Sequence, residues 1–170
     1  MREARGARRA NAGCIMRPFI RHIVLRGGPA MANAESVARE MVDAVNRNDM
    51  TRYRELLHPE YSYTGGDGQT ERGPDAGVAI TQMYRTAFPD DMKLDVQKIH
   101  AAGDTAIVEF IGKGTHRGDL AGIAPTGRKV EIPVITVLEI KDGKVHTERE
   151  YMDSGYLMQQ LGVVPATATA

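Results

Sequence analysis

Tryptophan is absent from the 170 residues, and cysteine occurs only once, at Cys14. Cys14 lies in an arginine-rich leader, so the rest of the chain has no disulfide, no zinc–thiolate cluster and no cysteine nucleophile. No segment approaches the roughly 18 consecutive apolar residues that are needed to cross a bilayer. We therefore expect a cytoplasmic protein with no membrane partner.

Excess positive charge is also lacking, because 22 basic residues balance 22 acidic ones. The balance is uneven along the chain: residues 1–30 hold seven arginines and one acid, which leaves 15 basic and 21 acidic residues in the remainder. That remainder, with a net charge of −6, offers no basic stripe that could follow a phosphate backbone. Nucleic acid is not an expected partner.

The arginine-rich leader, residues 1–30, has several interpretations. Arg17, Arg21 and His22 interrupt its apolar segment, which disfavours a secretory signal. A mitochondrial presequence would be rich in serine, yet the first serine is Ser36. The leader could instead be an anion-binding arm, or it could precede a true start at Met31. In each case we expect the folded domain to span residues 31–164 and residues 165–170 to form a flexible tail.

The remaining pattern places helices before strands. Apolar residues recur at helical spacing over 33–48, a shorter helix follows over 49–58, and Pro74 begins a third helix. After Pro89 the pattern changes to four strand candidates over 92–101, 105–116, 128–140 and 144–153. Helices followed by an antiparallel meander predict one domain of the α+β class.

A two-residue turn at Asp142-Gly143 predicts the register of the last hairpin. With Lys141 opposite Lys144 and an unbroken ladder, Thr136 pairs with Arg149 and Ile132 with Asp153. Because side chains alternate between faces, this register places one set of residues under the helices. That set comprises Ile132, Val134, Thr136, Leu138 and Ile140 with Val145, Thr147, Arg149, Tyr151 and Asp153. The same register turns Glu131, Val137, Glu139, His146, Glu148 and Glu150 to the opposite, acidic face.

Asp153 is the candidate reactive group of this arrangement. A carboxylate on an apolar face loses hydration, which raises its pKa and suits it to act as a general base near neutral pH. The bland alternative is that Asp153 caps the helix that follows it, a role that aspartate commonly fills. Both interpretations stay open, since one aspartate can cap a helix and also face a pocket.

Short motifs in a fixed order carry a resemblance to a known family. They are Phe88-Pro89-Asp90, Gly103-Asp104, Gly114-Thr115-His116, Pro125-Thr126-Gly127-Arg128, Asp142-Gly143-Lys144, and Asp153 followed by Gln160-Leu161-Gly162. In this order and spacing, residues 33–164 resemble the SnoaL-like polyketide cyclase or ester cyclase family.

The resemblance implies a cone-shaped barrel of N-terminal helices packed on a curved antiparallel sheet, the nuclear-transport-factor-2-like fold. It also implies aldol-type acid/base chemistry on a carbonyl compound without metal or cofactor, with Asp153 as the acid/base. A homodimer is a further implication of the family. The family often has a tryptophan where this chain has Arg149, which suggests a smaller or more polar ligand.

Around Asp153 we expect four substrate-binding residues, namely Tyr151, Arg149, His116 and Thr136. The alternatives are a non-catalytic binding or dimerisation module of the same fold and, less favoured, an epoxide-hydrolase-like enzyme. The pair His146 and Glu148 supplies only two ligands where zinc needs three or four, so we expect no metal site.

Overall fold

The computed structural model describes residues 33–164. The interpretations of the leader and the tail concern residues outside this range and stay predictions. The helices are α1 (Ala34–Asn46), α2 (Met50–Leu56), α3 (Pro74–Ala87) and α4 (Ser154–Leu161). The strands are β1 (Leu57–Thr64), β2 (Thr70–Arg72), β3 (Lys93–Ala102), β4 (Thr105–Thr115), β5 (Lys129–Lys141) and β6 (Lys144–Met152). Within the described residues no helix is long and apolar enough for a membrane span.

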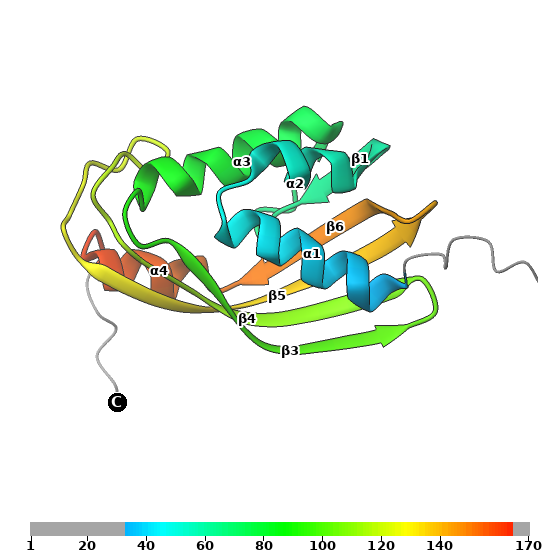
Figure 1. The fold of residues 1–170 in the computed structure, drawn as a ribbon. Coiled ribbons are helices and arrows are strands. Elements are labelled where there is room, and N and C mark those ends of the chain that lie inside the picture. The colour runs from blue at the N-terminus through cyan, green and yellow to red at the C-terminus, as the bar shows by residue number, and fades with distance from the viewer. Residues whose placement is uncertain (1–32, 165–170) are drawn as a thin grey trace, which may run out of the picture.

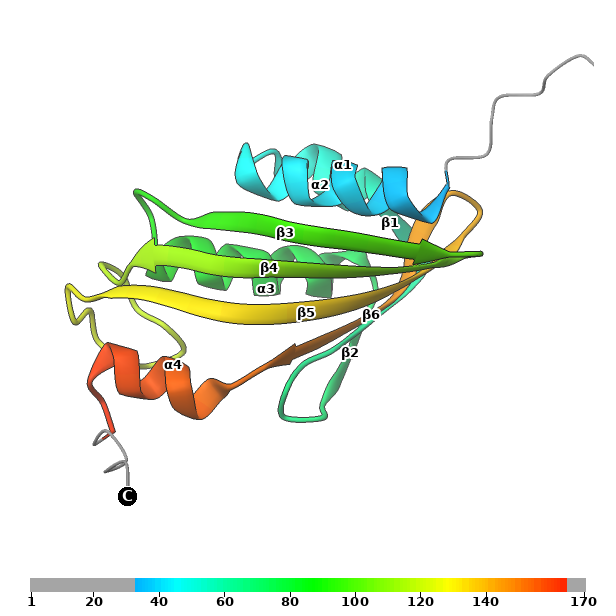
Figure 2. The same cartoon turned by 90° about the horizontal axis from the view of Figure 1, so that it is seen from below.

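One curved sheet of six strands, in the order β2-β1-β6-β5-β4-β3, forms the floor of the molecule. Helices α1, α2 and α3 cover one face, and α4 follows β6 at one end of the sheet (Figure 1). Among residues 33–164, no helix covers the opposite face of β3–β6 (Figure 2). The predicted antiparallel meander is confirmed, and β1 adds to it by pairing in parallel with β6. The α+β fold of helices on a curved sheet is therefore confirmed.

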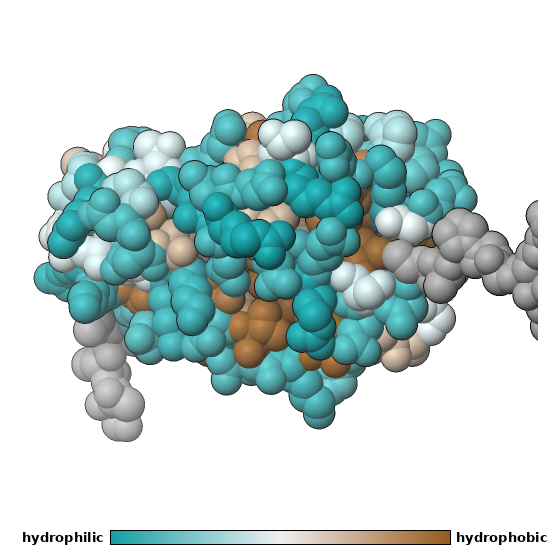
Figure 3. All heavy atoms as spheres, viewed as in Figure 1, coloured by the Kyte–Doolittle hydropathy of each residue, from teal (hydrophilic) through white to brown (hydrophobic). Residues whose placement is uncertain are grey.

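Amphipathic helices cover the hydrophobic core on one face of the sheet. In α1 the side chain of Asn33 accepts a hydrogen bond from the Ser36 backbone N–H, an N-cap that satisfies one of the free donors of the first turn. The apolar face of α1 packs against β3 and β4, and its polar face points to water, so the surface seen in Figure 3 is mainly hydrophilic with small hydrophobic clusters. The helix contributes Ala34, Val37, Ala38, Met41, Val42, Ala44 and Val45 to the core.

The predicted register of the last hairpin is wrong beyond its first two pairs. Lys141 does pair with Lys144, and Ile140 with Val145, but the next pair is Glu139 with Thr147. His146 is therefore an extra residue in β6, a β-bulge of the kind that leaves one residue unpaired and re-aims those that follow. The pairing of β1 with β6 is irregular over the same stretch, between Leu57 and Ser62.

One extra residue inverts the two faces of β6 beyond the bulge, because side chains alternate with a period of two. Leu138 now faces Glu148, Thr136 faces Glu150, and Val134 faces Met152. These residues lie beneath the helices. Arg149, Tyr151 and Asp153 belong instead to the uncovered side, where Tyr151 is 56% exposed.

Candidate functional site

An apolar cavity of ≈ 120 Å³ lies between the helices and the concave face of the sheet. Since one water molecule needs about 10–15 Å³, this volume suits a small organic ligand. Apolar side chains of α1, α3, β4 and β5 form most of the wall, among them Val42, Ile80, Val108 and Ile132. The polar side chains on the wall are Tyr53, Tyr63, Thr81, Tyr84, Lys93, Lys113, Thr136, Glu148 and Glu150.

Glu148 is the most deeply buried acid of this wall, with 7% of its surface exposed. The hydroxyl of Tyr61 donates a 2.5 Å hydrogen bond to its Oε2. Burial raises the pKa of Glu148, the Tyr61 bond opposes this shift and the charge of Glu150 adds to it, and together they bring the pKa to about 7. Near neutral pH this carboxyl therefore exchanges between a proton donor and a proton acceptor.

Glu150 is the second acid, two residues farther along the same face of β6. It is half-buried and accepts a 3.1 Å hydrogen bond from the hydroxyl of Tyr63. Burial raises the pKa of Glu150, and the Tyr63 bond opposes this shift. Two carboxyl groups in one apolar cavity do not ionise independently, since the first charge disfavours the second. The pair can therefore hold one proton and one negative charge at once, the state that acid/base chemistry needs.

Two tyrosines of β1 hold these acids in place. Tyr61 is fully buried, and α3 approaches it closely at Gly77, where a Cβ atom would lie 2.8 Å from Cε1 of Tyr61. Burial and the neighbouring acids raise the pKa of both Tyr61 and Tyr63, so their hydroxyls stay protonated and act as hydrogen-bond donors. Each donor favours the charged form of the glutamate that it contacts.

Asp153 lies outside the cavity and is exposed. Its side chain accepts a 2.9 Å hydrogen bond from the Tyr156 backbone N–H, which makes it the N-cap of α4. The capping interpretation is confirmed. The expected position beneath the helices is wrong, because the bulge at His146 turns this residue to the other face, where it borders a second, more open hollow with Pro133, Ile135 and Tyr151. A catalytic role for Asp153 stays a prediction without the geometry on which it was based.

The four residues predicted to bind substrate do not come together. Thr136 is buried and lines the cavity, as expected. Tyr151 and Arg149 lie on the uncovered face, where Nη1 of Arg149 donates a 2.8 Å bond to Glu139. His116 is buried beside the Phe88 ring, behind the cavity wall, and its Nδ1 accepts a 3.2 Å bond from the Thr126 backbone N–H.

The sequence patterns did not predict the acid–tyrosine pairs of the cavity, which comprise Glu148, Glu150, Tyr61 and Tyr63. Their signal was present as two alternating pairs, Tyr-x-Tyr in β1 and Glu-x-Glu in β6, each with the spacing of one strand face. A buried Glu-x-Glu needs hydrogen-bond donors on the adjacent strand, and Tyr-x-Tyr supplies two.

Comparison with known proteins assigns the chain to a family. The model of the SnoaL-like polyketide cyclases matches residues 35–161, most of the chain and nearly all of the described domain. The chain belongs to this family. Helices packed on a curved sheet are therefore the fold of a SnoaL-like protein.

Characterised relatives of this SnoaL-like protein are ester cyclases of Streptomyces. The aklanonic acid methyl ester cyclase AcmA of Streptomyces galilaeus is 29% identical over 133 residues, which cover 78% of this chain and 92% of that protein. The nogalonic acid methyl ester cyclase of Streptomyces nogalater is 27% identical over 123 residues, which cover 72% of this chain and 92% of that protein. The similarity thus spans nearly the whole length of both relatives.

Solved structures show the same fold. AclR of Streptomyces galilaeus superposes with a TM-score of 0.71 at 26% identity, over 82% of this chain and 87% of that one. A protein of ketosteroid isomerase-like fold from Catenulispora acidiphila superposes with a TM-score of 0.65 at 16% identity, over 81% of this chain and 100% of that one.

The position where the family often has tryptophan does not line the cavity in this structure. Arg149 occupies it and lies on the uncovered face of the sheet, paired with Glu139. The lack of a tryptophan there leaves the cavity wall unchanged, so it does not support the expectation of a smaller or more polar ligand.

Proposed function

We propose that this SnoaL-like protein closes a ring in a small ester-containing carbonyl compound by an intramolecular aldol reaction, with Glu150 and Glu148 as base and acid. The observation that carries the proposal is the pair of inward-facing carboxyls in an otherwise apolar cavity. This pair favours glutamates of β6 over Asp153 for the acid/base work. The apolar wall favours a largely apolar substrate over a sugar or a nucleotide.

The surroundings of the two glutamates suggest how they share the work. Glu150 is the more exposed of the two, and the Tyr63 hydroxyl stabilises its charged form, so it takes the proton from the carbon beside a carbonyl. Glu148 accepts the Tyr61 bond at Oε2, which leaves its other oxygen to carry a proton toward the carbonyl oxygen. The enolate carbon then attacks a second carbonyl, and the new alkoxide takes up the proton that Glu150 removed, which restores the Glu150 carboxylate.

A direct experiment uses the compounds named by the relatives. We expect the purified protein to convert aklanonic acid methyl ester into an isomer of unchanged mass, because an intramolecular aldol addition neither gains nor loses atoms. In deuterated water the carbon beside the carbonyl should also exchange its hydrogen faster than in buffer alone, as mass spectrometry would measure.

The alternative is a binding module that carries out no chemistry. Carbonyl probes that raise the melting temperature of the protein but undergo neither ring closure nor hydrogen exchange would support the binding module. The cyclase proposal would then be wrong. Heat-denatured protein serves as the control for uncatalysed exchange.

The uncovered sheet face supports the family expectation of a homodimer. Three large apolar side chains are exposed on it, with 36% of Ile107, 44% of Ile135 and 56% of Tyr151 accessible. Ile135 lies opposite Tyr151 of β6, and Ile107 of β4 lies opposite Val137, two residues along β5 from Ile135, so the three side chains share one face. Light scattering should give twice the chain mass, and Ile135→Lys should shift it toward the monomer. A wild-type protein that is monomeric at high concentration would contradict the dimer.

A further inference from the structure

The buried side chain of His116 has a ring nitrogen without a hydrogen-bond partner. Nδ1 accepts a 3.2 Å bond from the Thr126 backbone N–H, with the Thr126 hydroxyl 3.1 Å away, so this nitrogen carries the lone pair and Nε2 carries the proton. The residue is fully buried, and none of residues 33–164 accepts a hydrogen bond from Nε2. A buried donor that has lost water without gaining an acceptor costs free energy, so this group points to an acceptor from outside the chain.

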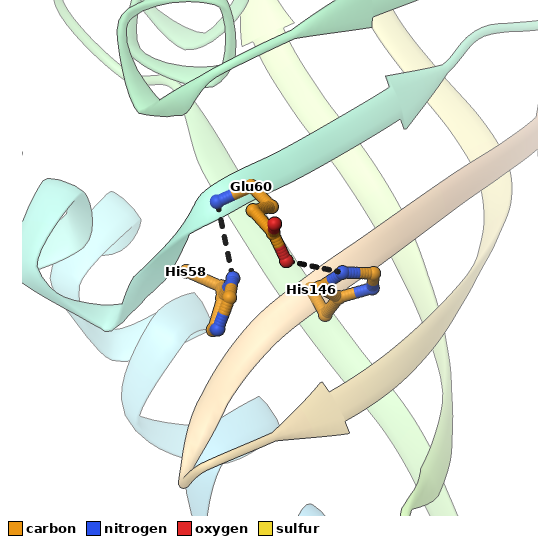
Figure 4. Close-up of side chains that lie close together, drawn as sticks. All are labelled: His58, Glu60 and His146. Carbon is orange, nitrogen blue, oxygen red and sulfur yellow. Dashed lines mark hydrogen bonds and ion pairs between the residues drawn. The ribbon is translucent and has the colours of Figure 1, made fainter.

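The other histidines of residues 33–164 all have polar partners. Figure 4 shows two of them beside Glu60, whose backbone N–H donates a 3.0 Å bond to Nδ1 of His58 and whose Oε2 lies 3.8 Å from Nε2 of His146. Nε2 of His100 lies 2.8 Å from a carboxylate on the adjacent strand. Within these residues, a buried imidazole N–H without an acceptor is therefore particular to His116.

The imidazole of His116 lies on the cavity side of the sheet. The pairing of β4 with β5 has no register shift, so Gly112, Gly114 and His116 lie on one face by alternation. Gly112 lines the cavity, and the ladder continues to His116, whose backbone N–H donates a 2.9 Å bond to the Arg128 carbonyl. His116 therefore lies on the concave face, just beyond the end of the cavity.

One aromatic ring separates His116 from the cavity. Phe88 lines the cavity, and its ring centroid lies 5.6 Å from that of His116 at a tilt of 46°. The same side chain packs on Gly114, where a Cβ atom would lie 2.9 Å from the Cβ of Phe88. Rotation of this one side chain would therefore join the buried N–H to the cavity.

We propose that His116 is a specificity-determining residue of the cavity: after the Phe88 ring rotates, Nε2–H donates a hydrogen bond to a carbonyl oxygen of the substrate. The inference rests on the proposed function, because it concerns the same cavity. Glu150 lies opposite Thr136, and the cavity wall follows β5 from Thr136 to Val130, about 20 Å along the strand. The substrate is therefore an elongated molecule with one carbonyl beside the glutamates and another at its far end.

The tautomer of His116 decides which ligands fit this end of the cavity. An N–H donor is satisfied by a ketone, ester or quinone oxygen, each of which offers lone pairs. A purely apolar end would leave the donor unpaired, and an ammonium or amide N–H would place two donors face to face. His116 thus selects for a ligand with an acceptor at this end and against a ligand with a donor there.

The test compares 4,4′-diacetylbiphenyl with 4-acetylbiphenyl, since only the diketone can reach the acids and His116 at once. Calorimetry with the full-length protein should show the diketone binding about fivefold more tightly than the monoketone. His116→Leu keeps a side chain of similar volume without a donor, and should reduce this preference to less than about twofold. His116→Gln, which retains an N–H donor, should restore part of it. The matched control is His100→Leu, which removes an exposed histidine of β3 and should keep the wild-type preference.

Proton–nitrogen NMR of the wild type gives a readout that does not depend on any variant folding. The Nε2–H proton of His116, assigned by its contacts with the Phe88 ring, should move downfield on addition of 4,4′-diacetylbiphenyl. It should stay in place with biphenyl, which has no acceptor. An unchanged signal with the diketone, or a His116→Leu variant that keeps the full preference, would overturn the inference.

Hydrogen exchange separates this inference from the cyclase proposal. The acetyl hydrogens of the probes exchange in deuterated water when the cavity acids act on them. Exchange in the wild type without a preference for the diketone would reject the role of His116 and keep the cyclase proposal. A preference that depends on His116, without exchange, would keep the binding role of His116 and reject the cyclase proposal.

Discussion

Replacing Glu150 by glutamine should lower kcat by about 10²–10⁴-fold, the usual effect of removing a general base. Glutamine keeps the size of the side chain and can still accept the Tyr63 hydrogen bond, but it cannot take a proton from carbon. Substrate binding, measured by calorimetry or by the shift in melting temperature, should change little. A loss of kcat with retained binding would identify a group that acts in the chemical step.

The control for this experiment is Asp153→Asn. Asparagine caps helices about as well as aspartate, so this variant should keep both its melting temperature and its turnover. The opposite pattern, full activity in Glu150→Gln and loss of activity in Asp153→Asn, would return the catalytic role to Asp153. Both variants change one carboxylate into an amide, so any difference between them comes from position alone.

The second large effect concerns the pH dependence of stability. The pKa of Glu148 rises from 4.5 to about 7 on folding, because burial disfavours its charge. The folded protein therefore holds this proton more tightly than the unfolded chain, and stability is lost as pH rises from about 4.5 through 7. The shift corresponds to a loss on the order of 3 kcal/mol at alkaline pH.

Glu148→Gln should remove most of this dependence. We expect the free energy of unfolding of the variant, measured with urea at pH 5 and pH 8, to differ less between the two pH values than that of the wild type. At pH 8 the variant should be the more stable protein, since its neutral amide still accepts the Tyr61 bond. Glu150 remains in both proteins, and in the variant it no longer has a second carboxyl beside it, which also reduces the pH dependence.

Glu139→Gln provides the matched control, because it removes a carboxyl from the uncovered face of the adjacent strand. This variant loses one surface ion pair, worth about 0–1 kcal/mol, and should keep the wild-type pH dependence. Parallel curves for Glu148→Gln and the wild type would contradict the buried-acid interpretation.

Sequence patterns predicted the elements well, for physical reasons. The amphipathic period of α1, the proline that starts α3 and the Asp-Gly turn between β5 and β6 are local signals, and the structure confirms each of them. The order of helices and strands then limited the fold to a sheet covered on one side.

The site was harder to predict, because it depends on a single irregularity. In β6 neither alternate set of residues is clearly apolar: Thr147, Arg149 and Tyr151 compete with Glu148, Glu150 and Met152. Hydrophobic patterning therefore could not choose between the two faces, and the turn was the remaining guide. A register counted from a turn fails as soon as one strand holds an extra residue. Of the predicted site only Thr136, which lies on the regular strand β5, kept its place.

Because of the bulge at His146, the direction in which the β6 side chains point depends more on the number of residues in the strand than on their types. Deleting this one residue would restore an even ladder and exchange the two faces of the strand beyond it. The guanidinium of Arg149 and the phenol of Tyr151 would then lie under the helices, and both cavity acids would be exposed to water. A homologue that is one residue shorter between the hairpin turn and the Glu-x-Glu pair should therefore not retain this chemistry, however similar its other residues are.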